Sequence, residues 1–282
     1  MDASPPLGET ISVNGIEMYY ETRGVGEPLV LLHGGAGAGV NWALIFKDAP
    51  PGYRLIVPDL RGHGRSTNPS ACFTFRQSAF DVFALLDHLD IERFKAIGMS
   101  LGAKTLLHMA TQQPARVAAM LLVSATPYFP DQARAIMRQL SPDNRTDAEW
   151  EQMRQWHKHG DEQIRALWKM ANAFKDSYDD MNFTPPYLST ITARTLIVHG
   201  DRDPLYPVNM AVELYNSIPG SYLWVIPNGG HGPIFGEMAD RFTKTALAFL
   251  SDEWTTHDVN ARPNQTLEPT AGRCTERLKD EL

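Results

Sequence analysis

Cysteine and long apolar runs are scarce in this chain. Only two of its 282 residues are cysteines, Cys72 and Cys274, and they lie in very different parts of the sequence. Two distant thiols do not provide the disulfide framework that holds small secreted domains together. No segment reaches the roughly 18 consecutive apolar residues that span a bilayer. We therefore expect a protein without structural disulfides and without a membrane partner.

Positive charge is also in short supply. Lys and Arg number 26 against 33 Asp and Glu, which leaves a formal net charge of -7. A mildly acidic protein has no general attraction to phosphate backbones, so we do not expect nucleic acid as a partner. Residues 1–6 lack the basic and apolar regions of a signal peptide, which predicts a cytoplasmic location. The final Lys279–Leu282 spells a retention signal that is read only inside the secretory lumen, so we treat it as a chance match.

What the sequence does contain is a regular alternation of two patterns. Thr10–Tyr20, with Asn14 and Gly15 at its centre, predicts an opening β-hairpin. Behind it, short apolar runs alternate with amphipathic stretches, which is typical of a parallel sheet with helices packed on it. Such a sheet binds its ligands beyond the carboxyl ends of its strands. Strands are expected at Leu29–Leu32, Leu55–Val57, Phe94–Ile97, Ala118–Val123, Leu196–Val198 and Tyr222–Ile226, and helices near Arg76–Leu89, Leu101–Gln112, Val208–Asn216 and Glu237–Leu250.

The segment Gly98–Gly102, with the sequence GMSLG, joins a predicted strand to a predicted helix. The pattern G-x-S-x-G is typical of a nucleophile elbow, a strained turn whose flanking positions leave no room for a Cβ. Such a turn lifts the hydroxyl of Ser100 clear of the sheet. It also directs the first N–H groups of the helix, beginning with Leu101, toward a reacting carbonyl. The five residues alone are a weak signal, because an ordinary strand-to-helix connection can carry them, and the context decides.

Two later strand ends supply partners for this serine. Asp203 follows one predicted strand, and His231 lies in the glycine-rich loop after the next. In a triad with the chain order Ser100, Asp203, His231, the serine attacks and the histidine takes its proton. The aspartate orients the imidazole ring and stabilises the imidazolium.

A glycine-rich loop, His33–Gly39, follows the predicted strand Leu29–Leu32. Its glycines let the backbone approach a ligand, and we expect the N–H of Gly35 to act as an oxyanion donor beside that of Leu101. A dinucleotide-binding fingerprint also follows a strand, but it needs a glycine where this chain has Val40. No nucleotide cofactor is therefore expected.

Together with the segment Asp59–Ser66, these motifs resemble the α/β-hydrolase superfamily over roughly residues 9–251. The resemblance implies an α/β fold with a mostly parallel eight-stranded sheet, flanked by helices and carrying a helical cap insertion. It also separates two aspartates in one loop. The family pattern selects Asp203 as the acid and leaves Asp201 as a loop or capping residue.

The strand and helix alternation stops between Thr126 and Thr190, a stretch too long for a simple loop. We expect a helical cap over 127–189, a hydrolase core over 1–126 and 190–251, and a disordered polar tail over 252–282. Within the cap, Thr146–Glu149 reads as a capping box, and Gly160 followed by Asp161 as a helix stop and a new N-cap. Most apolar residues of the cap should pack it onto the core, while a minority face the substrate. The candidates for the latter are Trp150, Trp156 and Trp168.

The function these patterns predict is that of a serine hydrolase for a small-molecule carboxylic ester or lactone, working through an acyl-enzyme without cofactor or metal. No histidine has further ligands at metal-binding spacing. Carbon–carbon bond hydrolases of vinylogous diketones share the implied fold but often carry tryptophan after the catalytic histidine, where this chain has Gly232. A ligand-binding receptor on the same fold is another alternative. The segment Asn264–Ala271 looks like a translated bacterial repeat and suggests a bacterial source, while no feature fixes the oligomeric state.

Overall fold

A single eight-stranded sheet forms the centre of the computed structural model, which describes residues 8–251, 253 and 254. The strand order is β1-β2-β4-β3-β5-β6-β7-β8. The pairs β1/β2 and β2/β4 are antiparallel, and all further pairs are parallel. The predicted α/β fold with a mostly parallel sheet is thus confirmed. The strands are β1 (Glu9–Val13), β2 (Ile16–Gly24), β3 (Glu27–Leu32), β4 (Tyr53–Pro58), β5 (Phe94–Met99), β6 (Val117–Val123), β7 (Arg194–Gly200) and β8 (Tyr222–Ile226).

The opening hairpin forms where the sequence predicts it. Asn14 and Gly15 both have positive φ, 46° and 78°, which is the geometry of a two-residue type I′ turn. Most of the predicted tail, with Cys274 and the C-terminal tetrapeptide, lies outside the described residues. In the part of the chain that the structure describes, no helix is long and apolar enough to cross a membrane.

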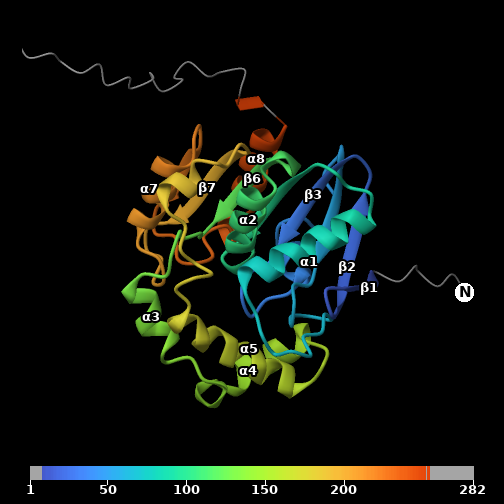
Figure 1. Cartoon of the computed structure of the whole chain (residues 1–282), viewed down its shortest axis with the longest axis vertical. Helices are drawn as coiled ribbons and strands as arrows, with labels where there is room; N and C mark the ends of the chain where they lie inside the picture. Colours follow the sequence, from blue (N-terminus) through green and yellow to red (C-terminus); the bar gives the residue numbers. More distant parts are fainter. Residues whose placement is uncertain (1–7, 252, 255–282) are drawn as a thin grey trace, which may run out of the picture.

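Helices cover both faces of the sheet, and each face has its own core. Successive residues of β3 alternate between them: Leu29 and Leu31 belong to one apolar cluster, Val30 and Leu32 to the other. This alternation follows from the two-residue period of a strand, and burial on both faces explains why the strands are continuous apolar runs. Figure 1 shows α1 and α2 lying in front of the sheet. The cluster with Val30 and Leu32 includes residues of α1 (Phe75–His88), α2 (Leu101–Gln112) and α7 (Val208–Ser217), and the cluster with Leu29 and Leu31 those of η1 (Gly39–Leu44) and α8 (Ala239–Leu250).

An insert of short helices separates β6 from β7 and gathers at one end of the molecule in Figure 1. Helix α4 begins with the predicted capping box, in which Thr146 and Glu149 exchange side-chain to backbone hydrogen bonds of 3.2 and 2.8 Å. The next helix begins at Asp161, as expected, but Gly160 is its N-cap in place of Asp161, with φ of 82°. The insert contains α3 (Asp131–Met137), η3 (Pro142–Asn144), α4 (Asp147–Trp156), α5 (Asp161–Ala173), η4 (Phe174–Asp176) and α6 (Pro185–Leu188).

Candidate active site

Ser100 occupies a strained turn between β5 and α2. Its backbone has φ of 49° and ψ of -104°, and its N–H donates to the carbonyl of Val123 at the end of β6 (2.8 Å). A Cβ at Gly98 would come within 2.6 Å of the Gly102 carbonyl oxygen, and a Cβ at Gly102 within 2.2 Å of that of Leu32. Glycine is therefore required on both sides, and the turn has the geometry of a nucleophile elbow.

The structure brings Ser100, His231 and Asp203 into one hydrogen-bonded row. His231 Nε2 lies 2.8 Å from Ser100 Oγ, and His231 Nδ1 lies 2.8 Å from Asp203 Oδ2. The carboxylate can only accept, so Nδ1 carries the proton and Nε2 is free to accept one from the serine hydroxyl. The three residues follow the carboxyl ends of β5, β7 and β8, which meet at one edge of the sheet.

Asp203 is held by more than the histidine. Its Oδ1 accepts the backbone N–H groups of Leu205 (2.8 Å) and Tyr206 (3.1 Å). Burial raises the pKa of Asp203, but the hydrogen bond from His231 and these backbone donors outweigh it and hold the pKa below its ordinary value. Asp201, by contrast, is exposed and its side chain lies 3.7 Å from Arg202. Of the two aspartates, the one next to His231 is Asp203.

The glycine loop after β3 lies against the start of α2. A Cβ on Gly35 would lie 3.6 Å from the Leu101 side chain, so the two expected oxyanion donors are neighbours. Leu101 is the first residue of its helix, and its N–H has no partner within the helix. The imidazole of His33 binds the Gly34 carbonyl, which belongs to the peptide that carries the Gly35 N–H.

His33 fixes the peptide that carries the Gly35 N–H. The ring nitrogen Nε2 accepts the N–H of Leu60 (2.9 Å), so the proton is on Nδ1, which donates to the carbonyl of Gly34 (2.8 Å). Because that peptide is trans, holding its carbonyl on one side directs the N–H of Gly35 to the other. Burial lowers the pKa of His33 to about 4, which keeps the ring neutral in this arrangement.

An open cavity of about 620 Å³ lies between the glycine loop and the insert. Its wall includes Met99, directly before Ser100, and the tryptophans Trp156 and Trp168 of the insert. The third candidate, Trp150, is not part of this wall, because its ring packs against the guanidinium groups of Arg154 and Arg165. The remaining lining residues are His33, Gly34, Gly35, Ala36, Gly37, Asn41, Trp42, Leu44, Ala148, Glu149, Gln152, Met153 and Phe235.

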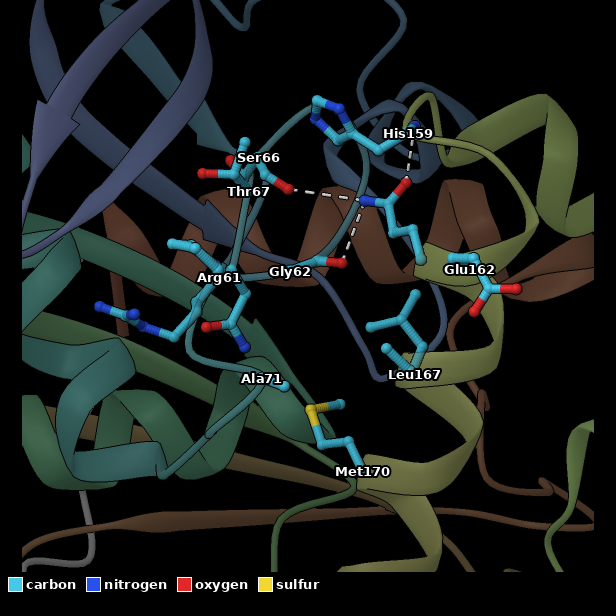
Figure 2. Close-up of a pocket in the computed structure, with 13 residues that line it drawn as sticks. Arg61, Gly62, Ser66, Thr67, Ala71, His159, Glu162, Leu167 and Met170 are labelled. Carbon is cyan, nitrogen blue, oxygen red and sulfur yellow. Dashed lines mark hydrogen bonds between the residues drawn. The ribbon is translucent and has the colours of Figure 1, made fainter.

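A second hollow, of about 480 Å³, lies between α5 and the loop after β4 (Figure 2). Arg61 on its wall is bound to Asp81 by hydrogen bonds of 2.7 and 2.8 Å. The amide of Gln163 crosses the gap and donates to the carbonyls of Gly62 and Gly64, both at 3.1 Å. Figure 2 shows Gly62 and His159 on opposite sides of this bridge. The hollow therefore lies at the boundary between the insert and the core, where hydrogen bonds from Gln163 join the two. We call this boundary the seam.

Two buried residues near the site were not among the site residues predicted from the sequence. Lys104, one helical turn after Ser100, donates to the hydroxyl of Tyr206 (2.9 Å) and lies among the rings of Phe75, Phe129 and Tyr206. Burial lowers the pKa of Lys104 to about 7. The Tyr206 ring in turn packs edge-on against His231, with centroids 5.3 Å apart. A lysine inside a helix whose other residues are mostly apolar was the available signal.

His157 is the second such residue. The sequence places it at a charged helix end and on one helical face with Trp150 and Met153, a face expected mainly to pack the insert onto the core. Its side chain is buried, as that packing requires, and it contacts two loops of the core that the sequence did not identify. Within the described residues, no group of three or more His, Cys, Asp or Glu side chains is arranged to hold a metal ion.

Comparison with known proteins agrees with this geometry. The family model of the alpha/beta hydrolase fold matches residues 27–148. The chain is similar to 2-hydroxy-6-oxononadienedioate/2-hydroxy-6-oxononatrienedioate hydrolase 2 of Pseudomonas putida, with 28% identity over 271 residues, 83% of this chain and 92% of that protein. It is also similar to the serine hydrolase BPHL of Mus musculus, with 27% identity over 258 residues and 85% of each chain. Among solved structures, a serine hydrolase involved in carbazole degradation (CarC enzyme) has 25% identity and a TM-score of 0.70, covering 86% of this chain and 98% of that one.

The fold and the serine turn together define a class of protein. The sheet order, the turn at Ser100 and the matches to known proteins agree with one another. The chain has the alpha/beta hydrolase fold and is similar to hydrolases of the α/β-hydrolase superfamily.

Proposed function

We propose that this protein is a serine hydrolase that cleaves an uncharged carboxylic ester or lactone through an acyl-enzyme. The observation that carries the proposal is the hydrogen-bonded row of Ser100, His231 and Asp203, with 2.8 Å at each link. A hydroxyl next to an oriented imidazole is the arrangement that turns serine into a nucleophile.

The reaction follows from this arrangement. Ser100 Oγ attacks the carbonyl carbon while His231 Nε2 takes its proton, and Asp203 stabilises the imidazolium that forms. The negative charge on the carbonyl oxygen is stabilised by the N–H groups of Gly35 and Leu101. His231 then gives the proton to the departing alcohol. In the second half, His231 activates a water molecule that releases the acid from Ser100.

The walls of the 620 Å³ cavity support an uncharged substrate. Among the described residues no Lys or Arg lines it, and the one carboxylate on its wall, that of Glu149, is paired with Arg145 at 3.1 Å. Tryptophan, methionine and phenylalanine side chains dominate the rest of the surface, which favours an apolar acyl or alcohol group. A substrate with its own carboxylate would find no cation on this wall.

The second candidate is a carbon–carbon bond hydrolase acting on a vinylogous diketone. It is favoured by the similarity to a Pseudomonas putida protein named as a hydrolase of 2-hydroxy-6-oxononadienedioate. That substrate is a dicarboxylate by name, and the cavity of this protein offers no cation for either group. We therefore rank the ester or lactone first.

The test is a substrate screen with a matched variant. Purified protein is assayed with p-nitrophenyl acetate, p-nitrophenyl butyrate, a set of lactones and a vinylogous 1,5-diketone, and Ser100→Ala is assayed beside it. We expect ester or lactone turnover that falls by about 10⁴ or more in Ser100→Ala. Turnover of the diketone alone would favour the second candidate. Tight binding without any turnover would replace both with a receptor role.

A further inference from the structure

His157 joins the insert to two loops of the core. It is the C-cap of α4, and its side chain is buried. Ring nitrogen Nδ1 accepts the N–H of Gly64 (2.9 Å), and Nε2 lies 3.1 Å from the carbonyl oxygen of Ala36. A backbone N–H only donates and a carbonyl only accepts, so the ring must be neutral with its proton on Nε2. Burial lowers the pKa of His157 to about 4, which agrees with a neutral ring.

Ala36 is the residue after the expected oxyanion donor Gly35, and its backbone is strained. Its φ of 58° lies in the left-handed region, which alanine rarely adopts. A residue keeps such a conformation only when its surroundings hold it there. The hydrogen bond from His157 to the Ala36 carbonyl is one such restraint, and it comes from the insert.

We propose that His157 is a positioning residue of the oxyanion hole, and that its bond to the Ala36 carbonyl makes the geometry at Gly35 depend on how the insert docks. This inference rests on the proposed function, because it assigns Gly35 the role of stabilising the reacting oxygen. A displacement of an oxyanion donor of about 1 Å costs much of its effect on the transition state while leaving ground-state binding nearly unchanged.

Gln163 provides a matched control for simple docking of the insert. Like His157, it lies on the insert and binds the loop at Gly62 and Gly64. Within the described residues, its side-chain hydrogen bonds go to His159, Gly62, Gly64 and Ser66 and do not involve the glycine loop after β3. Loss of Gln163 therefore loosens the same seam without removing the restraint on Ala36.

The test compares two amide substitutions that each keep one half of the imidazole. In His157→Gln the terminal amide nitrogen can take the place of Nε2 and donate to Ala36. In His157→Asn the shorter amide can accept from Gly64 but does not reach Ala36. We measure the second-order rate at which a fluorophosphonate labels Ser100, together with kcat and KM on a p-nitrophenyl ester, after confirming by circular dichroism that each variant is folded.

We expect His157→Asn to slow labelling and lower kcat by about 10-fold to 100-fold with little change in KM, because the donor is misplaced in the transition state. His157→Gln should recover most of the rate, and Gln163→Ala should stay within about threefold of wild type. Equal rates in the two His157 variants, or an equal loss in Gln163→Ala, would overturn the inference.

A third variant, Ala36→Gly, tests whether the bond from His157 acts through the strained backbone. Glycine adopts a positive φ without strain, so in an Ala36→Gly background the loop no longer depends on the bond from His157. Adding His157→Asn to this background should therefore cost less than about threefold in kcat and labelling, measured against Ala36→Gly alone. If His157→Asn still lowers labelling by about 10-fold or more in the Ala36→Gly background, the bond to residue 36 does not act through this strained backbone and the inference is wrong. The proposed function fails separately, when wild-type protein is not labelled at Ser100.

Discussion

Two aspartates of one loop differ in every contact that matters for catalysis. Asp203 binds His231 and two backbone N–H groups, whereas Asp201 is exposed beside Arg202. We expect Asp203→Asn to leave the protein folded and to lower kcat by up to about 10⁴, because an amide favours the wrong histidine tautomer and cannot stabilise the imidazolium. Asp201→Asn should change kcat by less than about threefold. Steady-state kinetics on the best ester measure both variants. A larger loss of kcat in Asp201→Asn than in Asp203→Asn would contradict the assignment of Asp203 as the acid.

The buried amine of Lys104 should make the free energy of unfolding depend on pH. Burial lowers its pKa in the folded protein from 10.5 to about 7. Between these two values the unfolded chain binds a proton that the folded protein does not, so the free energy of unfolding rises with pH over this window. Below pH 7 both states are protonated, and the folded state carries the full cost of the buried charge.

Lys104→Met removes this cost. Its free energy of unfolding should exceed that of wild type at pH 6, by an amount on the order of a few kcal/mol, and the difference should shrink toward pH 10. Lys169→Met, on the exposed surface of α5, is the control and should not change the slope. Urea unfolding at pH 6, 8 and 10 measures both variants. A difference that does not vary with pH would mean that Lys104 is neutral throughout or is charged throughout.

At the scale of elements, the helices of the insert place three tryptophans in two environments. Trp156 and Trp168 line the cavity beside the glycine loop, while Trp150 packs against Arg154 and Arg165. Replacing Trp156 or Trp168 by alanine enlarges the cavity and should raise the ratio of kcat/KM for long-chain over short-chain esters by about 10-fold. Trp150→Ala should leave that ratio unchanged. The same shift in all three variants would indicate a general loosening of the insert and not a change of the wall.

The elements themselves were largely predictable, because local signals decide them. Helix α2 begins and ends where the sequence predicts, at Leu101 and Gln112, and α4 follows its capping box at Thr146. The partners of His157 were not predictable, because Gly64 and Ala36 are 93 and 121 residues away in the chain. Periodicity and capping carry no information about pairings over such distances, so contacts between insert and core emerge only from the folded arrangement.

The proximity of Ser100, His231 and Asp203 was predictable for a different reason. Parallel strands bring their carboxyl ends to one edge of the sheet, so residues that follow separate strands meet although they are far apart in the chain. Ser100 and His231 are 131 residues apart and 2.8 Å from each other. No comparable rule predicts the environment of Lys104. Tyr206 and Phe129, which contact it, lie in segments whose packing is not determined by the strand order.

For the molecule as a whole, buried neutral histidines predict sensitivity to acid. His33, His63 and His157 are buried with rings 5.0 to 6.1 Å apart along the row. Burial lowers the pKa of His33 and His157 from 6.5 to about 4 and that of His63 well below 6.5. Between pH 6.5 and 4 the unfolded chain therefore binds protons that the folded protein does not.

Stability should be fully present above pH 6.5 and should fall as the pH drops toward 4. The three histidines together contribute a slope of up to about 4 kcal/mol per pH unit near pH 5. His157→Gln removes one of the three titrating rings and should make the slope that they contribute shallower by about a third. Chemical unfolding between pH 4.5 and 7.5 tests this, and a free energy of unfolding that stays level over that range would contradict neutral burial of the three rings.

The backbone of Ser100 sets a limit on how stable this molecule can be while it remains a catalyst. A non-glycine residue at φ of 49° and ψ of -104° costs about 1 to 3 kcal/mol relative to a relaxed conformation. Ser100→Gly should release part of this strain and raise the free energy of unfolding by about 1 kcal/mol, while Ser100→Ala, which keeps the Cβ, should not. Thermal unfolding of the two inactive variants separates strain from loss of the hydroxyl. Selection for thermostability alone would thus favour replacing Ser100, the proposed nucleophile, and under this proposal only selection for turnover retains a serine at this position.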